Sequence, residues 1–150
     1  MSVRRINQDD FPQIVDIAER FHAESVETAP FSRESVYTAL FSAINSPNQN
    51  AFVSIQDEKI AGGIIVYVAP LYYSEQLVMF ECGFYVCPES RSGAIRICKE
   101  LIDAAIAWGR EKGAKEARFI DTARINENAY ARLLSINNFD TLGTVYRRSM

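Results

Sequence analysis

Residues 83–96 combine several features that suit the binding of a phosphate group. They read Gly-Phe-Tyr-Val-Cys-Pro-Glu-Ser-Arg-Ser-Gly-Ala-Ile-Arg, an apolar segment followed by a short polar turn and the start of an amphipathic stretch. A strand-to-helix turn of this kind directs free backbone N–H groups and the positive end of a helix toward one spot. Arg91 and Arg96 would add charge-assisted hydrogen bonds to the same anion. The turn lacks the Gly-Lys-Ser/Thr ending of a P-loop and the glycines of a dinucleotide fingerprint, so it predicts a phosphate site of another kind.

Glu81 is the candidate general base, because it is the only charged residue in the otherwise apolar segment Leu77–Val86. Burial there would raise the pKa of its carboxyl group toward the working pH of the protein. In a regular strand Glu81 shares a face with Tyr85 and lies opposite Val86, whereas a bulge at Gly83 would bring it round to the other face. The other interpretation of Glu81 is a structural carboxylate that is paired with a cation or faces the edge of the sheet.

Other reactive residue types are few. The chain holds one histidine, His22, and three cysteines, none of them in metal-ligand spacing, so we expect no metal site. Cys87 has no histidine near it in the sequence, which disfavours a cysteine nucleophile. The odd number of cysteines and their apolar or helical surroundings indicate reduced, packed thiols.

Composition and charge describe one ordinary domain that spans residues 1–150. Of these residues 48% are hydrophobic and 23% are charged, and 16 Lys and Arg stand against 19 Asp and Glu, for a net charge of -3. A faintly acidic protein gives no field that attracts nucleic acid. No stretch approaches the roughly 20 apolar residues of a membrane span, and the first residues lack the apolar core of a signal peptide. We therefore expect a cytoplasmic protein with neither nucleic acid nor membrane as a partner.

The spacing of apolar residues predicts an α/β domain with a mixed sheet. We expect helices after the capping residues Asp9 or Asp10, Ser32 and Asn126, and a long helix from Ala94 that stops at Gly113. β-Branched and alternating apolar residues predict strands at residues 3–6, 51–56, 60–68, 77–86, 117–121 and 142–148. The strand-helix-strand unit across 77–121 should be parallel and right-handed, and its first turn lies where α/β proteins bind ligands.

The turn resembles the acyl-CoA-binding turn of the GNAT acyltransferases, whose pattern is Val-x-Pro-x-x-Arg/Gln-x-x-Gly-x-Gly/Ala. Val86, Pro88 and Arg91 match this pattern, while Ala94 and Arg96 stand at its last two positions. The order of predicted elements also matches the GNAT fold over nearly all 150 residues. The family's late helix usually ends in Tyr-x-x-x-Gly-Phe, and here Leu134, Asn138 and Phe139 occupy those three positions.

The resemblance implies a GNAT-like fold with a largely antiparallel central sheet flanked by helices. Acetyl-CoA, the cosubstrate, would bind at a splay between two parallel central strands, and no metal is needed. The implied activity is direct N-acetylation of a primary amine of a small molecule or peptide, with Glu81 as base and Tyr130 as a candidate acid, although Tyr130 also suits packing. The cofactor-binding residues implied are Phe84, Tyr85, Val86, Arg91, Ser92, Gly93, Ala94, Arg96 and Asn126.

Other functions remain open at this point. A GNAT-fold protein that binds CoA without activity, or that serves as an interaction module, fits the departures at Arg96, Leu134 and Asn138. A nucleotide-binding protein would use the same turn without pantetheine. The stretch that contains His22 and Glu24 lies where the resemblance places the entry of the acceptor, and a homodimer would cover the open edge of the sheet.

Overall fold

The computed structural model describes residues 2–121 and 123–150. Five strands, four α-helices and two short 3-10 turns follow one another along the chain. In order they are β1 (Ser2–Arg5), η1 (Gln8–Asp10), α1 (Phe11–Glu24), α2 (Arg33–Asn45), β2 (Gln49–Gln56), β3 (Lys59–Pro70), β4 (Leu77–Val86), η2 (Pro88–Gly93), α3 (Ala94–Glu111), β5 (Glu116–Arg118) and α4 (Glu127–Ile136).

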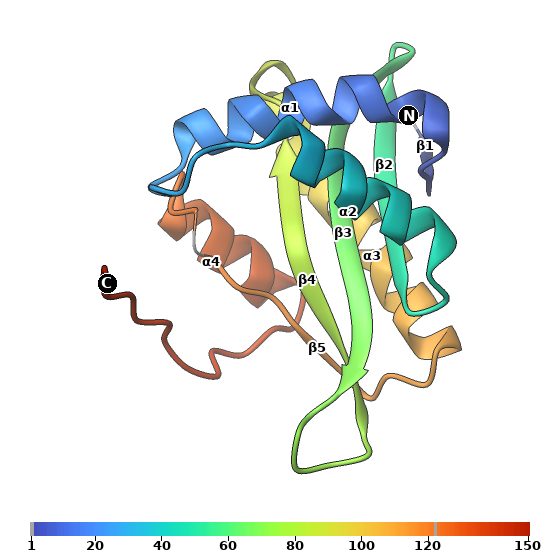
Figure 1. Ribbon diagram of the computed structural model, residues 1–150, viewed down its shortest axis with the longest axis vertical. Helices are drawn as coiled ribbons and strands as arrows, with labels where there is room; N and C mark the ends of the chain where they lie inside the picture. Colours follow the sequence, from blue (N-terminus) through green and yellow to red (C-terminus); the bar gives the residue numbers. More distant parts are fainter. Residues whose placement is uncertain (1, 122) are drawn as a thin grey trace.

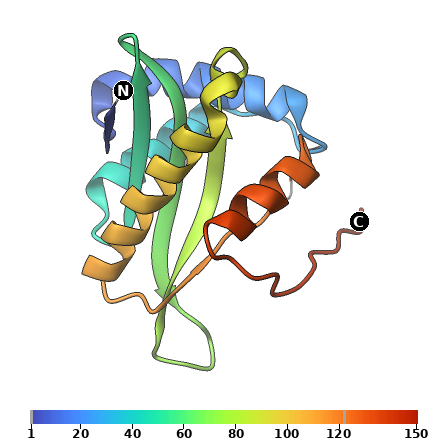
Figure 2. The ribbon, with the colours of Figure 1, turned by 180° about the vertical axis from the view of Figure 1, so that it is seen from behind.

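The strands form one twisted sheet in the order β1-β2-β3-β4-β5. The first four are antiparallel neighbours, and β4 and β5 are parallel. Helices α1 and α2 cover one face of the sheet, and α3 and α4 lie on the other (Figures 1 and 2). This arrangement confirms the predicted mixed, largely antiparallel sheet flanked by helices. Every helix in the described part of the chain is too short or too polar to cross a lipid bilayer.

Each face of the sheet has its own apolar core. The apolar side chains of α3 recur every three or four residues, and they pack on the sheet through Ile97, Leu101, Ile102, Ala105 and Trp108, all of which are buried as predicted. On the opposite face Val15 of α1 and Leu40 of α2 pack against residues of β2 and β3. The two cores fix the sheet between helical layers, and β4 takes part in the α3 core through Met79.

The helix starts follow the predicted caps in two cases and differ in one. The Ser32 side chain accepts a hydrogen bond from the Ser35 N–H at the start of α2, and Asn126 caps α4 through the Ala129 N–H. Asp10 precedes α1 but does not cap it. Its carboxylate instead takes two hydrogen bonds of 2.8 Å from Arg4 and one of 2.8 Å from the Asn7 N–H, which lowers the pKa of Asp10. Asn7 caps the 3-10 turn that leads into α1, with Asp10 as its capping-box partner, and the ion pair with Arg4 ties β1 to the start of α1.

The C-terminal part of the sheet differs from prediction. The strand expected at 142–148 is absent, and its residues are exposed and without regular structure. The strand expected at 117–121 is shorter and begins earlier, as β5 at Glu116–Arg118. With three residues, β5 offers a short edge to a further strand, and no side chain of the terminal segment enters the core. Arg147 links the terminal segment to the residues after α1, through a hydrogen bond of 3.5 Å to the Val26 carbonyl oxygen and a longer ion pair of 4.0 Å with Glu27.

Gly62 permits a close approach of β3 to its neighbours. A Cβ atom at this position would lie 2.8 Å from the carbonyl oxygen of Tyr85 in β4 and 3.2 Å from Cγ2 of Ile97 in α3. The first of these atoms belongs to the backbone, so it cannot turn aside as a flexible side chain would. The absence of a side chain at Gly62 therefore sets the spacing between β3, β4 and the start of α3.

We predict that Gly62→Ala destabilises the protein, because the added methyl group forces β3 away from β4. Overpacking of this kind costs roughly 1–3 kcal/mol, which lowers the melting temperature of a domain of this size by about 2–12 °C. Differential scanning calorimetry measures the effect. The control is Gly143→Ala, where a Cβ has no neighbour within 4 Å. Equal melting temperatures for the two variants would contradict the prediction.

Candidate active site

Strands β4 and β5 part soon after they meet. They pair only at Val78, Met79 and Phe80. Beyond this point β4 continues through residues 81–86 with no strand on its β5 side in the described part of the chain. Backbone N–H and C=O groups at alternate residues of this edge are therefore open to a ligand. The opening lies directly before η2 and α3, where the sequence predicted the phosphate-binding turn.

A bulge in β4 decides which face Glu81 occupies. Ile65 pairs with Gly83 and Val66 pairs with Glu81, so Cys82 is the extra residue. The bulge thus falls one residue before Gly83, the position considered from the sequence. Glu81 consequently lies on the face of Phe84 and Val86, toward α3 and α4, whereas Tyr85 faces α1. Cys82 itself is exposed, which corrects the expectation of a packed thiol, while Cys87 and Cys98 are buried.

Glu81 sits at the point where β5 leaves the sheet. Its Oε2 accepts a hydrogen bond of 3.4 Å from the N–H of Ile120, just after β5. The pKa of Glu81 is raised to about 7, chiefly by burial, with the Ile120 N–H lowering it and the nearby charge of Asp121 raising it. No cation among the described residues pairs with this carboxylate, so the structural alternative of a salt-bridged Glu does not apply. A carboxyl group that titrates near neutral pH suits proton transfer.

Tyr130 lies near Glu81 from the other side of the splay. It comes from α4, and its ring centroid is 6.1 Å from that of Phe84 in β4. Burial raises the pKa of Tyr130, and the charges of Glu81 and Asp121 raise it as well. The structure places Tyr130 near Phe84, on the face of β4 that Glu81 shares. The Tyr130 hydroxyl stays protonated at neutral pH and can donate a hydrogen bond.

The predicted phosphate-binding turn leads into α3 without a side-chain cap. Gly93 is the N-cap residue, no acidic side chain occupies the first turn of α3, and Ser92 and Gly93 are exposed. Ala94 is partly buried where the helix begins, and its N–H donates to the Arg91 carbonyl oxygen. Arg96 does not reach back over the turn, because it pairs with Glu100 one helical turn later at 2.9 Å. The exposed turn and the positive end of α3 suit an anion, although the Ala94 N–H is already paired.

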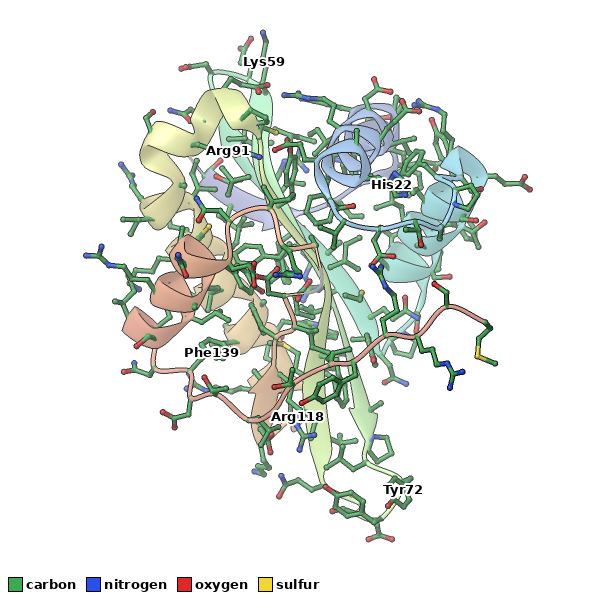
Figure 3. The ribbon with its side chains drawn as sticks, turned by 90° about the vertical axis from the view of Figure 1, so that its left-hand side faces the viewer. His22, Lys59, Tyr72, Arg91, Arg118 and Phe139 are labelled. Atoms are coloured by element: carbon green, nitrogen blue, oxygen red, sulfur yellow. The ribbon has the colours of Figure 1, made fainter. Side chains whose placement is uncertain are left out.

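Two ion pairs join this turn to α1, and the sequence analysis predicted neither of them. Arg20 binds Glu89 at 2.7 Å, and Arg91 binds Glu24 at 2.8 Å. The hydrogen bond from Arg20 lowers the pKa of Glu89 to about 2. Figure 3 shows Arg91 at the end of β4, between η2 and α1. The partners are 67 and 69 residues apart in sequence, a separation that no local pattern reports.

Asn126 and Asn138 fix the ends of α4. The Asn126 side chain accepts from the Ala129 N–H at 3.2 Å, so its role as a helix cap is confirmed, and a role as a ligand stays a prediction. Asn138 has a φ of 66°, a left-handed conformation that usually belongs to glycine. It is followed by Phe139, whose N–H donates to the Leu134 carbonyl oxygen and whose ring lies 4.8 Å from that of Phe119. Asparagine thus supplies the turn that the family builds with glycine.

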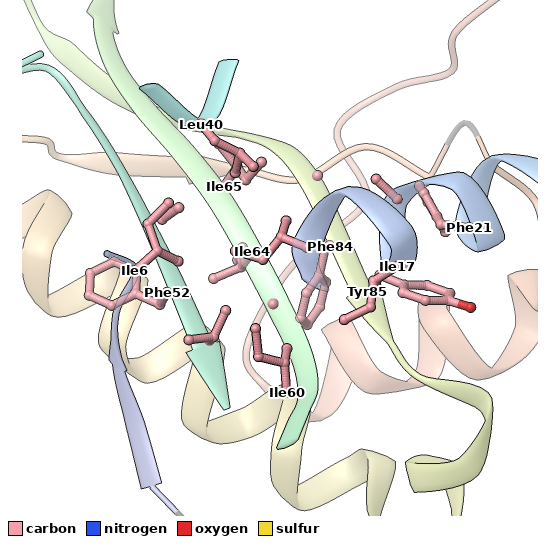
Figure 4. A pocket seen from close by; sticks show the side chains of 16 residues that line it. Ile6, Ile17, Phe21, Leu40, Phe52, Ile60, Ile64, Ile65, Phe84 and Tyr85 are labelled. Carbon is pink, nitrogen blue, oxygen red and sulfur yellow. The ribbon is translucent and has the colours of Figure 1, made fainter. Parts of the chain in front are cut away.

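An apolar cavity lies on the other face of the sheet. Its volume is about 90 Å³, and it is lined by residues of α1, α2 and the middle strands. Figure 4 shows Phe21, Ile17 and Tyr85 at one end of it, and Ile6 and Leu40 farther along. The cavity thus lies on the α1 side of the sheet, whereas Glu81 faces α3 and α4.

Comparison with known proteins identifies relatives. Residues 3–134 match the model of the acetyltransferase (GNAT) family, and no curated protein sequence matches the chain. A similar solved structure is an aminoglycoside acetyltransferase from an uncultured soil metagenomic sample, in complex with sisomicin. Its sequence is 25% identical, the TM-score is 0.68, and the match covers 99% of this chain and 96% of that one.

Two other similar structures have a TM-score of 0.75. AAC(6')-Iy with a CoA bisubstrate analogue has 17% identity and coverage of 99% and 97%, and the ribosomal-protein-alanine N-acetyltransferase of Brucella melitensis biovar Abortus 2308 has 15% identity and full coverage of both chains.

The pKa of Glu81 predicts a pH dependence of stability. Because this pKa rises from its ordinary 4.5 to about 7 on folding, the folded protein keeps a proton that the unfolded chain has already lost in this range. The contribution of Glu81 to the free energy of unfolding therefore falls as the pH rises from about 4.5 to about 7. Glu81→Gln keeps a hydrogen-bond acceptor for Ile120 and removes the ionisation, so its stability relative to wild type should increase across this window and level off above it.

Urea unfolding of both proteins at pH 5, 6, 7 and 8 measures this difference. Glu75→Gln, which neutralises an exposed carboxylate in the β3–β4 loop, is the control and should show no comparable trend. A difference between Glu81→Gln and wild type that stays constant with pH would show that Glu81 is not perturbed as described.

Proposed function

The chain belongs to the GNAT acetyltransferase family, and we propose that it transfers an acetyl group from acetyl-CoA directly to a primary amine of a small molecule or peptide. One observation carries the proposal above the others. A carboxyl group with a pKa of about 7, Glu81, lies at the point where β4 and β5 part, and the ring of Tyr130 lies near that of Phe84, on the face of β4 that Glu81 shares. A base and a hydrogen-bond donor placed together in this opening are what aminolysis of a thioester requires.

The residues of the opening fit a CoA thioester. The free edge of β4 offers the backbone of Phe84 and Val86 to the amide groups of pantetheine, in the manner of an added strand, whereas the backbone of Tyr85 faces β3. Arg91, the exposed residues Ser92 and Gly93 and the positive end of α3 at Ala94 suit the pyrophosphate. Arg96 would have to leave Glu100 to join them, and Asn126 lies across the opening on α4. The structure of AAC(6')-Iy with a CoA bisubstrate analogue supports this fit by its similar fold.

The thioester supplies an activated acetyl carbon and a sulfur leaving group. Glu81 in its ionised form takes a proton from the attacking amine, while a nitrogen–carbon bond forms and the carbon–sulfur bond breaks. The Val86 N–H is placed to donate to the carbonyl oxygen, which stabilises the negative charge that grows there. Tyr130, whose raised pKa keeps the proton on its hydroxyl, donates a hydrogen bond to the departing sulfur, and the proton that Glu81 took from the amine then passes to this thiolate, whose thiol has a pKa of about 8.5. The products are an N-acetylated amine and CoA as the free thiol, so the protons balance.

The proposal covers two classes of acceptor. Similar structures include an aminoglycoside enzyme and a ribosomal-protein enzyme, so the proposed acceptor is a primary amine of either a small molecule or a peptide. A screen of amines and peptides for acetylation distinguishes them. The three free cysteines fit the reducing conditions of the cytoplasm, and the exposed apolar residues Leu142, Val145 and Tyr146 give a homodimer a surface to cover.

Leu134 supports a second candidate function, a CoA-binding or interaction module without catalysis. The family's tyrosine hydroxyl is lost at this position, and Tyr130 would have to replace it from one helical turn earlier. The two candidates differ in turnover and share the binding of CoA. A nucleotide-binding protein would differ from both, because it would respond to nucleotides that lack pantetheine.

We predict that acetyl-CoA and CoA both raise the melting temperature and that ATP does not. Saturation at about 100 times the dissociation constant adds about 2.7 kcal/mol, or roughly 5 °C or more for this chain. Arg91→Ala should reduce the shift at a given acetyl-CoA concentration, since the variant lacks a cation for the pyrophosphate. Thermal-shift assays with the three ligands and a no-ligand control measure this. No change in the melting temperature with either acetyl-CoA or CoA would contradict the proposed enzyme. A rise in the melting temperature with ATP alone would favour a nucleotide-binding site.

We also predict that Glu81→Gln lowers kcat by roughly 100-fold or more with little change in the KM for acetyl-CoA, since it removes the base and leaves the cosubstrate site intact. Because Glu81 must be ionised to accept a proton, wild-type kcat should rise with pH through about 7, and this rise should vanish in the variant. Steady-state kinetics from pH 6 to 9, with an acceptor found in the screen, measure both effects. An unchanged kcat in Glu81→Gln would show that Glu81 is not the base.

A further inference from the structure

The apolar cavity beneath α1 has a buried end and an end that opens beside β4. Its lining residues from α2 and β2, such as Leu40 and Val53, are buried. Those from α1 and β4, such as Ile17, Phe21 and Tyr85, are half-buried and lie together at the other end (Figure 4). The open end of the cavity therefore adjoins the stretch of β4 that β5 leaves unpaired.

Gly83 leaves a gap in the row of side chains between this cavity and the free edge of β4. Side chains alternate across a strand, so Gly83 lies on the same face as Tyr85, toward α1. The three atoms nearest to a Cβ placed at Gly83 all belong to the Ile65 side chain, at 3.8–3.9 Å, which is ordinary contact. A flexible chain that starts at the free edge can thus cross Gly83 and enter the cavity.

The chemistry and size of the cavity suit a short aliphatic chain. Apart from the Tyr85 hydroxyl, which is bound to Glu24, no lining side chain carries a polar atom. Apolar cavities stay dry and bind apolar molecules, and one of about 150 Å³ holds benzene. By proportion, the volume of about 90 Å³ has room for roughly three or four carbon atoms.

We propose that the cavity holds the alkyl chain of an acyl donor, so that the protein transfers short aliphatic acyl groups longer than acetyl, with butyryl as the best fit. This donor class rests on the proposed function and deepens it, because the chain enters from a CoA thioester at the free edge of β4. The pyrophosphate turn follows β4, so the pantetheine arm would run back along the strand and bring its acyl end toward Gly83. A butyryl chain roughly fills the volume, whereas the methyl group of acetyl leaves most of it empty.

The two faces of β4 keep the acyl chain apart from the base. Glu81 is on the opposite face, toward α3 and α4, so the chain leaves free the side on which the base takes the proton of the amine. The reaction is otherwise that of acetyl transfer. A nitrogen–carbon bond forms, the carbon–sulfur bond breaks, and the proton of the amine ends on the thiol of CoA.

Calorimetric titration of wild type with CoA, acetyl-CoA, propionyl-CoA, butyryl-CoA and octanoyl-CoA tests the fit. Affinity should rise roughly fourfold with each methylene group from acetyl to butyryl, as burial of aliphatic carbon predicts, and octanoyl-CoA should gain nothing more. Equal affinity for acetyl-CoA and butyryl-CoA, or a gain that continues to octanoyl-CoA, would overturn the inference and leave the proposed function intact. No binding of any of the five ligands would overturn both.

Three variants that change the volume of the cavity place the chain within it. Gly83→Ala fills the gap, and Ala18→Leu fills the cavity from α1, so each should lower the ratio of butyryl-CoA to acetyl-CoA affinity by roughly fourfold or more. Ile65→Val removes the Cδ1 atom that lies nearest to Gly83, so the preferred chain should become about one carbon longer. Ala39→Leu is the matched control, because Ala39 is an exposed alanine of α2 outside the cavity lining, and it should keep the wild-type ratio.

Turnover provides the last measurement. Mass spectrometry of the product formed from butyryl-CoA and an amine found in the screen should show the N-butyryl amine. A ratio that stays at the wild-type value in both Gly83→Ala and Ala18→Leu would overturn the inference, and the second variant keeps the test valid if the first does not fold. An altered KM for the amine in Ala18→Leu, with unchanged affinities for all acyl donors, would assign the cavity to the acceptor and overturn the inference as well.

Discussion

The short pairing of β4 with β5 is the constraint on which the site depends. Three paired residues hold the two strands together, and then each strand follows its own course. The parting leaves an edge of β4 unpaired and gives the Glu81 carboxylate one backbone donor, Ile120, and no cation among the described residues. A longer ladder would have satisfied the backbone and closed the opening. The open edge of β4 thus results from this early parting, and burial raises the pKa of the Glu81 carboxyl group beside it.

The bulge at Cys82 distributes the chemistry over the two faces of β4. Without it, Glu81 would share a face with Tyr85, and the base would lie among the ion pairs at the end of α1. With the bulge, Glu81 lies on the same face as Phe84, on the α4 side, where burial raises the pKa of its carboxyl group. On the α1 side Tyr85 binds Glu24, and this hydrogen bond and the nearby cations lower the pKa of Glu24. One extra residue in a strand therefore produces two carboxylates with opposite electrostatic settings.

Much of this fold could be predicted from local patterns, and the rest depends on contacts between distant segments. The apolar stripe of α3 and the caps at Ser32 and Asn126 each depend on a few neighbouring residues, so the local sequence predicts them. The same is true of Glu81, a lone charge in an apolar strand. The place of the bulge is different, because it depends on the register between β3 and β4. The terminal strand was wrongly predicted because alternation at 142–148 says nothing of whether β5 offers an edge long enough to pair with. The pairing of Arg91 with Glu24 joins segments that no spacing relates.

The departures from the family pattern differ in physical weight. Asn138 stands where the family has glycine, and its left-handed φ of 66° shows that asparagine meets the conformational demand at this position. Arg96 replaces a small residue, but its side chain turns along α3 to Glu100 and leaves the first turn uncovered. Leu134 is the departure that conformation does not compensate, since a hydroxyl is lost and none replaces it there. Tyr130 lies one turn earlier on the same helix, with its ring near that of Phe84, and the proposed transfer takes its hydrogen-bond donor from this position.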